Sequence, residues 1–133
     1  MAIRSKSTHE ITPQDNIARN NKADRTSDDI MHLNHIVAAM EQIDRYTRGM
    51  SESEFLSRTM VQDAVIHQIE LIGEAASSVS VEFKNEHPKL QWAGMTDIRK
   101  KIIPESFNID FVKVWNAVQD DIPLRKQAIR KLL

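Results

Sequence analysis

The residues of this chain best suited to chemistry are three consecutive cations, Arg99, Lys100 and Lys101. An arginine guanidinium stays charged and donates paired hydrogen bonds to phosphate oxygens, and a lysine adds a positive point charge. Shortly after these cations the chain has Pro104 and Ser106. Proline has no ionisable group, and a serine hydroxyl does not transfer protons near neutral pH without a base to activate it. The cations can therefore bind a phosphodiester, but neither Pro104 nor Ser106 is a proton-transfer group. A solvated basic helix end is the alternative interpretation.

Net charge is unevenly distributed along the chain, although the total is only −1. Residues 1–25 carry +2, residues 26–98 carry −7, and residues 99–133 carry +4. A polyanion would be attracted to the last of these segments, which begins at Arg99, rather than to the acidic middle. In the alternative interpretation, the final cations only complement the negative end of a last helix: Arg125, Lys126, Arg130 and Lys131.

Other titratable residues lie upstream of this segment. His32 and His35 are three residues apart on a predicted helix, but two ligands do not make a metal site, so we predict no metal and no cofactor. His67 is either a new acid–base group or an exposed helix residue. Glu74 is either an ion-pair partner that orients Arg99 or a solvent-exposed glutamate.

Composition is that of one globular domain. Of the 133 residues, 41% are hydrophobic and 28% are charged, which suffices for a packed core and an ordinary soluble surface. There is no cysteine, so disulfides, thiolate nucleophiles and cysteine-based zinc sites are excluded. We expect no membrane span and no secretory signal, because no apolar run has the necessary length or position. A reducing cytoplasm fits these observations.

Apolar residues recur at helical spacing along most of the chain, without the alternation typical of strands. Residues 1–26 are polar, so we predict a disordered tail before a helical domain over residues 27–133. Gly73 within a helix costs about 1 kcal/mol relative to Ala, which predicts close approach of a neighbouring helix, either from this chain or from a second copy. The result is an all-α bundle of four or five helices. The first expected helix runs from Ser27, as cap, to Gly49, and a short second helix begins at a capping box of Ser51 and Glu54. The third covers about 61–79, with Phe83 extending its apolar face, and the fourth covers about 92–103. The last begins at Asn108 or Asp110 and has a kink or restart at Pro123.

Three parts of the sequence, in this order and spacing, resemble the HepT-like toxins, a branch of the HEPN superfamily of small helical ribonucleases. The resemblance covers roughly residues 27–133. In that family an arginine is followed by His-x-Tyr, and Arg99 stands at the position of the arginine. Pro104 and Ser106 stand where the histidine and tyrosine belong, and His67 replaces a usual arginine. The parts that carry the resemblance are Gln62-Asp63-Ala64-Val65-Ile66 with Ile69-Glu70-Leu71-Ile72-Gly73-Glu74-Ala75, then His87-Pro88 with Trp92 and Gly94-Met95, and then Ile109-Asp110, Val114-Trp115 and Asp121-Ile122-Pro123-Leu124.

The resemblance implies a helical homodimer that cuts RNA without a metal, in a cleft shared by two motifs. It implies RNA contact through Arg99, with Lys100 and Lys101 beside it. Whether Glu74 and His67 support this site stays open. It also implies a partner, a nucleotidyltransferase antitoxin of the MntA type, which attaches AMP to the motif tyrosine. Ser106 occupies that acceptor position but is shorter and less acidic than tyrosine.

The sequence thus leaves three functions open. The first is the toxin subunit of a toxin–antitoxin module, with cleavage weakened or lost because Pro104 and Ser106 cannot replace the histidine and tyrosine. The second is a non-catalytic module that dimerises, holds the antitoxin and binds RNA. The third is a helical adaptor unrelated to RNA.

Overall fold

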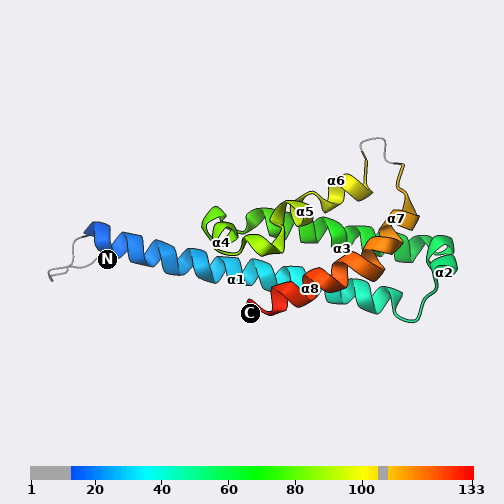
Figure 1. Cartoon of the computed structure of the whole chain (residues 1–133), viewed down its shortest axis with the longest axis horizontal. Coiled ribbons are helices and arrows are strands. Elements are labelled where there is room, and N and C mark those ends of the chain that lie inside the picture. Colours follow the sequence, from blue (N-terminus) through cyan, green and yellow to red (C-terminus); the bar gives the residue numbers. More distant parts are fainter. Residues whose placement is uncertain (1–12, 105–107) are drawn as a thin grey trace, which may run out of the picture.

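The computed structural model describes residues 13–104 and 108–133, with side chains from residue 27 onward except that of residue 99. No strand occurs within these ranges, and the fold is an all-α bundle, as predicted. Figure 1 shows the two longest helices lying side by side along the molecule. The elements are α1 (Pro13–Thr47), α2 (Glu52–Ser57), α3 (Thr59–Ser78), α4 (Val81–Glu86), a 3₁₀ turn (Pro88–Leu90), α5 (Trp92–Thr96), α6 (Ile98–Ile102), α7 (Phe111–Asn116), a π-helical turn (Ala117–Asp121) and α8 (Ile122–Arg130). None of the described helices is long and apolar enough to cross a membrane.

The start of the first helix was predicted wrongly. We expected a cap at Ser27, but α1 begins at Pro13, and its first turns extend beyond the rest of the bundle (Figure 1). Apolar periodicity stops at Ile30, so the residues that precede it carry no amphipathic signal for a helix. The part of the predicted disordered tail that covers residues 1–12 lies outside the described residues.

The core forms where α1 packs antiparallel against α3. Both predicted apolar stripes are confirmed, and their central residues are fully or almost fully buried. Burying side chains of this size contributes about 1.5–3 kcal/mol each, which makes the pair the main source of stability. The stripe on α1 consists of Leu33, Ile36, Met40 and Ile43, and the stripe on α3 consists of Val65, Ile69, Ile72 and Ala76.

The connection between the two long helices follows the sequence signals. Gly49 adopts a positive φ of 75°, which glycine allows without strain, and α1 ends just before it. Ser51 and Glu54 form the predicted capping box, since each side chain accepts a hydrogen bond from the other's backbone N–H. Phe55 on α2 is buried, and its ring lies 5.3 Å from that of Trp115, so α2 is fixed over α7.

A break after α3 was not predicted, since we expected Phe83 to extend that helix. The chain instead starts α4 after Ser80, whose side chain accepts a hydrogen bond from the N–H of Phe83. Asp29 of α1 is only 3% exposed and accepts hydrogen bonds from the backbone N–H (2.8 Å) and the hydroxyl (2.6 Å) of Ser80. The carboxylate of Asp29, on another helix, therefore accepts a hydrogen bond from the backbone N–H of Ser80, which would otherwise have donated to a carbonyl of α3.

The predicted helix over 92–103 is two short helices. Asp97 separates α5 from α6, and the hydroxyl of Thr96 donates to the carbonyls of Trp92 and Ala93. Such local side-chain hydrogen bonds compete with regular helix geometry. The predicted stop before Pro104 is confirmed, because α6 ends at Ile102.

The last helical segment is interrupted as its proline requires. Asp110 caps α7 by accepting hydrogen bonds from the N–H groups of Val112 and Lys113. A π-helical turn precedes α8, which has Pro123 in its first turn. Proline cannot donate to the carbonyl four residues earlier and would clash with it, so a wider turn relieves the conflict.

Replacing Asp29 by Ala should lower the free energy of unfolding by about 2 to 3 kcal/mol, because two hydrogen bonds to a buried carboxylate disappear. Denaturation in urea measures this change. Asp28→Ala, at the exposed neighbouring position, is the matched control and should cost much less. Equal costs for the two variants would contradict a bridge between Asp29 and Ser80.

Acid should weaken the capping box. The hydrogen bond from the backbone N–H of Ser51 holds the pKa of Glu54 below its ordinary value of 4.5. This carboxylate therefore stabilises the fold fully above about pH 4.5, and the contribution disappears as the pH falls through the lowered pKa. Glu54→Gln keeps a cap but cannot titrate, so its stability should fall less steeply than that of the unaltered protein between about pH 6 and pH 3. Glu52→Gln, which leaves the capping box intact, is the matched control, and an unchanged slope in Glu54→Gln would refute the prediction.

Candidate functional site

The predicted site, residues 99–106, falls on α6 and the residues that follow it, and we call it the motif segment. Ile98 and Ile102 are buried in the core, one helical turn apart, and they fix α6 to the bundle. Lys100 and Lys101 lie between them and are exposed. Alternation of anchoring and exposed positions within one short helix therefore presents two lysine side chains to solvent. The backbone of residue 99 belongs to the same helix.

The two positions that depart from the family motif are only partly described. Pro104 is half-buried directly after α6, next to the partly buried Ile103, and ends the helix. Ser106 and the side chain of Arg99 lie outside the described residues. The pairing of Glu74 with Arg99 therefore stays a prediction.

A small recess of about 250 Å³ lies between α3 and the end of α5, close to the start of α6. It is lined by Glu70, Gly73, Glu74, Ser77 and Thr96. The predicted supporting residue Glu74 is thus on the side of α3 that faces the end of α5, and its side chain is exposed. Sequence reasoning missed Glu70, although its four-residue spacing from Glu74 places both on one helix face.

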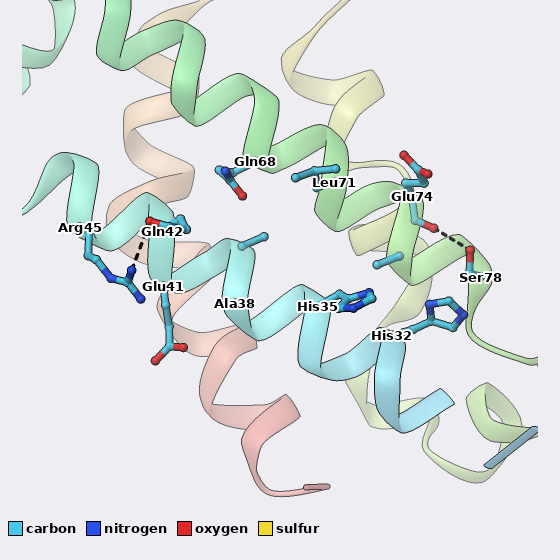
Figure 2. Close-up of a pocket in the computed structure, with 12 residues that line it drawn as sticks. His32, His35, Ala38, Glu41, Gln42, Arg45, Gln68, Leu71, Glu74 and Ser78 are labelled. Atoms are coloured by element: carbon cyan, nitrogen blue, oxygen red, sulfur yellow. Dashed lines mark hydrogen bonds between the residues drawn. The ribbon is translucent and has the colours of Figure 1, made fainter. Parts of the chain in front are cut away.

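A larger open groove of about 490 Å³ runs between α1 and α3 (Figure 2). His32 and His35 from α1 and Glu74 and Ser78 from α3 line one end, and the two histidine rings are 6.3 Å apart. Among the residues that the structure describes, no group of three or more histidine, aspartate or glutamate side chains could hold a metal. The groove therefore gives no support for a metal site at the two histidines.

His67 is exposed on α3 and lines neither of these hollows. The structure thus provides no observation that brings it to the motif segment. Trp92 and Trp115 are buried, and the indole N–H of Trp92 donates to the carbonyl of His87 at 2.9 Å. Both tryptophans are core residues rather than platforms on which bases would stack.

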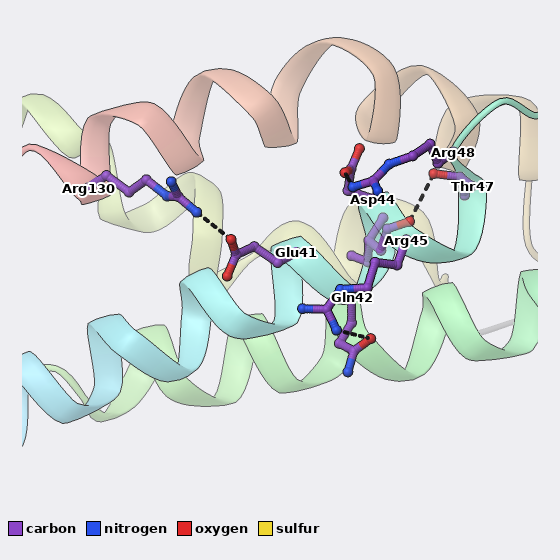
Figure 3. A network of polar contacts seen from close by, with 8 residues as sticks. Glu41, Gln42, Asp44, Arg45, Thr47, Arg48 and Arg130 are labelled. Atoms are coloured by element: carbon purple, nitrogen blue, oxygen red, sulfur yellow. Dashed lines mark hydrogen bonds and ion pairs between the residues drawn. The ribbon is translucent and has the colours of Figure 1, made fainter.

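Several cations are already engaged within the fold. Figure 3 shows Arg130 of α8 paired with Glu41 of α1, and Arg48 paired with Asp44. The hydrogen bond from Arg48 holds the pKa of Asp44 below its ordinary value of 3.8. In contrast, neither Lys100 nor Lys101 has an acidic partner within ion-pair distance in the described part of the chain. The positive charge that the basic segment offers to a ligand therefore includes both lysines of α6.

Arg125 does not complement a helix end, contrary to one of the two interpretations of the sequence. Its side chain is only 16% exposed and donates to the carboxylate of Asp121 at 3.1 Å. It also donates to the backbone carbonyl of Gln91, at 3.4 Å, just before α5. Arg125 therefore links α8 to the segment that leads to the predicted site. Nothing in the sequence indicated this contact, because the two residues are far apart along the chain.

Comparison with known proteins gives a consistent result. Residues 36–132 match the sequence model of a family described as Ribonuclease HepT-like. A protein of Methanocaldococcus jannaschii named "Gamma-glutamylcyclotransferase and putative RNase" is 35% identical over 103 residues, which are 77% of this chain and 46% of that protein. "Probable ribonuclease HepT" of Thermococcus cleftensis is 37% identical over 101 residues, which are 76% of this chain and 92% of that protein. The chain thus spans less than half of the first relative and most of the second. No solved structure matches it.

Proposed function

This chain belongs to the HepT-like ribonuclease family, and we propose that it is the RNA-binding toxin subunit of a toxin–antitoxin module. We propose further that its RNA cleavage is weakened or lost. The observation that carries the proposal is the composition of the motif segment. Two exposed lysines of α6, with no acidic partner among the described residues, adjoin Arg99, while Pro104 and Ser106 supply no proton-transfer group. The segment thus keeps the charge that holds a phosphate and lacks the acid–base chemistry that cleaves it.

Metal-independent cleavage of RNA requires three functions. A base removes the proton of the 2′-hydroxyl, whose oxygen forms a bond to the adjacent phosphorus, and the bond from phosphorus to the 5′-oxygen breaks. An acid protonates that leaving oxygen, and a cation stabilises the negative charge that builds on the phosphate. The products are a 2′,3′-cyclic phosphate and a 5′-hydroxyl. In this chain Arg99, Lys100 and Lys101 would supply the cation, and no motif residue would supply the acid or the base.

The proposed partners are a second copy of the chain, a nucleotidyltransferase antitoxin and RNA, in the cytoplasm. The support for all of these is family membership. Ser106 occupies the position that would accept AMP, and its short alkyl hydroxyl makes modification there inefficient. Glu74 and His67 are the proposed supporting residues. Glu74 has the better support, because it borders the recess next to α5.

A non-catalytic binding module is the second candidate function. The same observation favours it, because the lysines of α6 are exposed whether or not cleavage occurs. Residual turnover of RNA by the unaltered chain would favour the first candidate, and its absence leaves the two to be separated by whether restoring the motif residues restores cleavage.

Restoring the two motif residues should restore cleavage. The double variant Pro104→His/Ser106→Tyr should cut RNA about 10² to 10⁴ times faster than the unaltered chain, because a histidine would again transfer protons near neutral pH. Purified proteins are incubated with RNA in EDTA, and products with cyclic phosphate ends are quantified. Adding Arg99→Ala to the double variant should abolish the gain. Rapid cleavage by the unaltered chain, or none by the double variant, would contradict the proposal of an impaired nuclease.

Binding of RNA should depend on the two lysines of α6. Lys100→Ala/Lys101→Ala should weaken RNA binding and lower the slope of log affinity against log salt by roughly 0.7 for each phosphate that the protein no longer neutralises. Fluorescence anisotropy with labelled single-stranded RNA at several salt concentrations measures both quantities. Lys89→Ala, an exposed lysine outside the basic segment, should change neither. Equal slopes for the unaltered and doubly substituted proteins would exclude α6 from the RNA interface.

A further inference from the structure

We propose that Arg125 is a positioning residue for the motif segment, and that Gly94 is glycine because only its missing side chain leaves room for the guanidinium. This inference rests on the proposed function, since it concerns the segment that would hold RNA. It assigns to α8 a role beyond covering the core.

The first step is the path of the Arg125 side chain. It leaves α8 beside Asp121, whose carboxylate accepts from Nε at 3.1 Å, and reaches the carbonyl of Gln91 at 3.4 Å through Nη1. Gln91 is the residue before α5 and adopts a left-handed conformation with φ of 52°. A charged group with little exposure therefore connects α8 to the corner where α5 begins.

The second step is the contact with Gly94, in the middle of α5. A Cβ atom at this position would lie 2.5 Å from Nη2 of Arg125 and 3.2 Å from both Cζ and Nη1. Real Cβ atoms essentially never approach another heavy atom to 2.5 Å, so any side chain here would displace the guanidinium. Gly94 does not have a positive φ, unlike Gly49. The need for glycine is therefore close approach, not backbone freedom.

The third step is the contact of α5 with α3. A Cβ atom on Gly73 would lie 3.6 Å from the carbonyl oxygen of Thr96 and 3.7 Å from that of Met95, which is ordinary contact. Here the prediction of close helix approach is confirmed, and the neighbour belongs to the same chain. α5 thus contacts both α3 and Arg125.

The consequence concerns α6, which follows α5 after the single residue Asp97. Any displacement of α5 is passed directly to the backbone of residues 98–102. The buried side chains of Ile98 and Ile102 set the depth of α6, and the contact between Arg125 and Gly94 sets where its first residue begins. Arg125 would thereby act on RNA binding without touching RNA.

Two Gly→Ala variants separate positioning from general destabilisation. Gly94→Ala retains every charge of the chain, so a loss of RNA affinity cannot come from a missing cation. We expect it to weaken RNA binding by roughly fivefold or more, comparable to the removal of one direct RNA interaction, and to accelerate amide hydrogen exchange at residues 98–102. Gly73→Ala is the matched control. It should change neither quantity, because its Cβ meets only ordinary contacts.

Arg125→Ala completes a double-mutant cycle with Gly94→Ala. We expect Arg125→Ala to weaken binding as well, and Gly94→Ala to have no further effect in its presence, because the clash is then gone. Arg125→Lys keeps the charge but not the forked contact, so it should resemble Arg125→Ala more than the unaltered chain. If Gly94→Ala does not fold, the two Arg125 variants still test the proposal through hydrogen exchange.

Independent effects of the two substitutions on RNA affinity would overturn the proposal. The proposal would also be overturned if Gly94→Ala accelerated amide hydrogen exchange at residues 98–102 no more than Ile36→Val does. Ile36→Val is a core variant that lowers stability without altering charge or α5. If the unaltered chain binds no RNA, the proposed function fails, and hydrogen exchange alone then decides whether Arg125 positions α6.

Discussion

The burial of two apolar stripes between α1 and α3 is the constraint on which the rest of the structure depends. Leu33, Ile36 and Met40 of one helix and Val65 and Ile69 of the other are removed from solvent, and the remaining elements cover this pair. Dense packing of this kind leaves few positions for a third helix. At position 73 the backbone of α5 comes so close to α3 that an added Cβ atom would just touch the carbonyl oxygens of Met95 and Thr96.

The cations of the described residues fall into two groups, those that form ion pairs within the fold and those that do not. Arginines that pair with acids, such as Arg48 and Arg130, lie at or near the ends of helices, where exposed pairs add little to stability. The lysines of α6 have no such partners among the described residues and remain available to a polyanion. A cation used within the fold is neutralised, whereas one that has no partner at the end of a short helix can release counterions when RNA binds. The distribution of the ion pairs, more than the net charge, therefore shows which described cations are used within the fold and which remain exposed.

Family membership favours cleavage of RNA, whereas the residue types at positions 104 and 106 do not. The helical scaffold is that of a ribonuclease family, while Pro104 cannot transfer a proton. The same proline ends α6 by removing a hydrogen-bond donor and restricting the residue before it. One residue thus defines where the helix stops and places a side chain without proton-transfer chemistry directly after it.

The sequence by itself determined the features that depend on local rules. Periodicity predicted the stripes of α1 and α3, capping chemistry predicted the roles of Ser51 and Asp110, and the prolines predicted the end of α6 and the restart at α8. Only the tertiary structure decided which residues far apart in sequence meet. The bridge from Asp29 to Ser80, the break of the predicted helix 92–103, and the insertion of Arg125 over Gly94 had no signal in the pattern. The two long-range contacts depend on a partner that another helix brings, and spacing along one chain carries no information about such a partner.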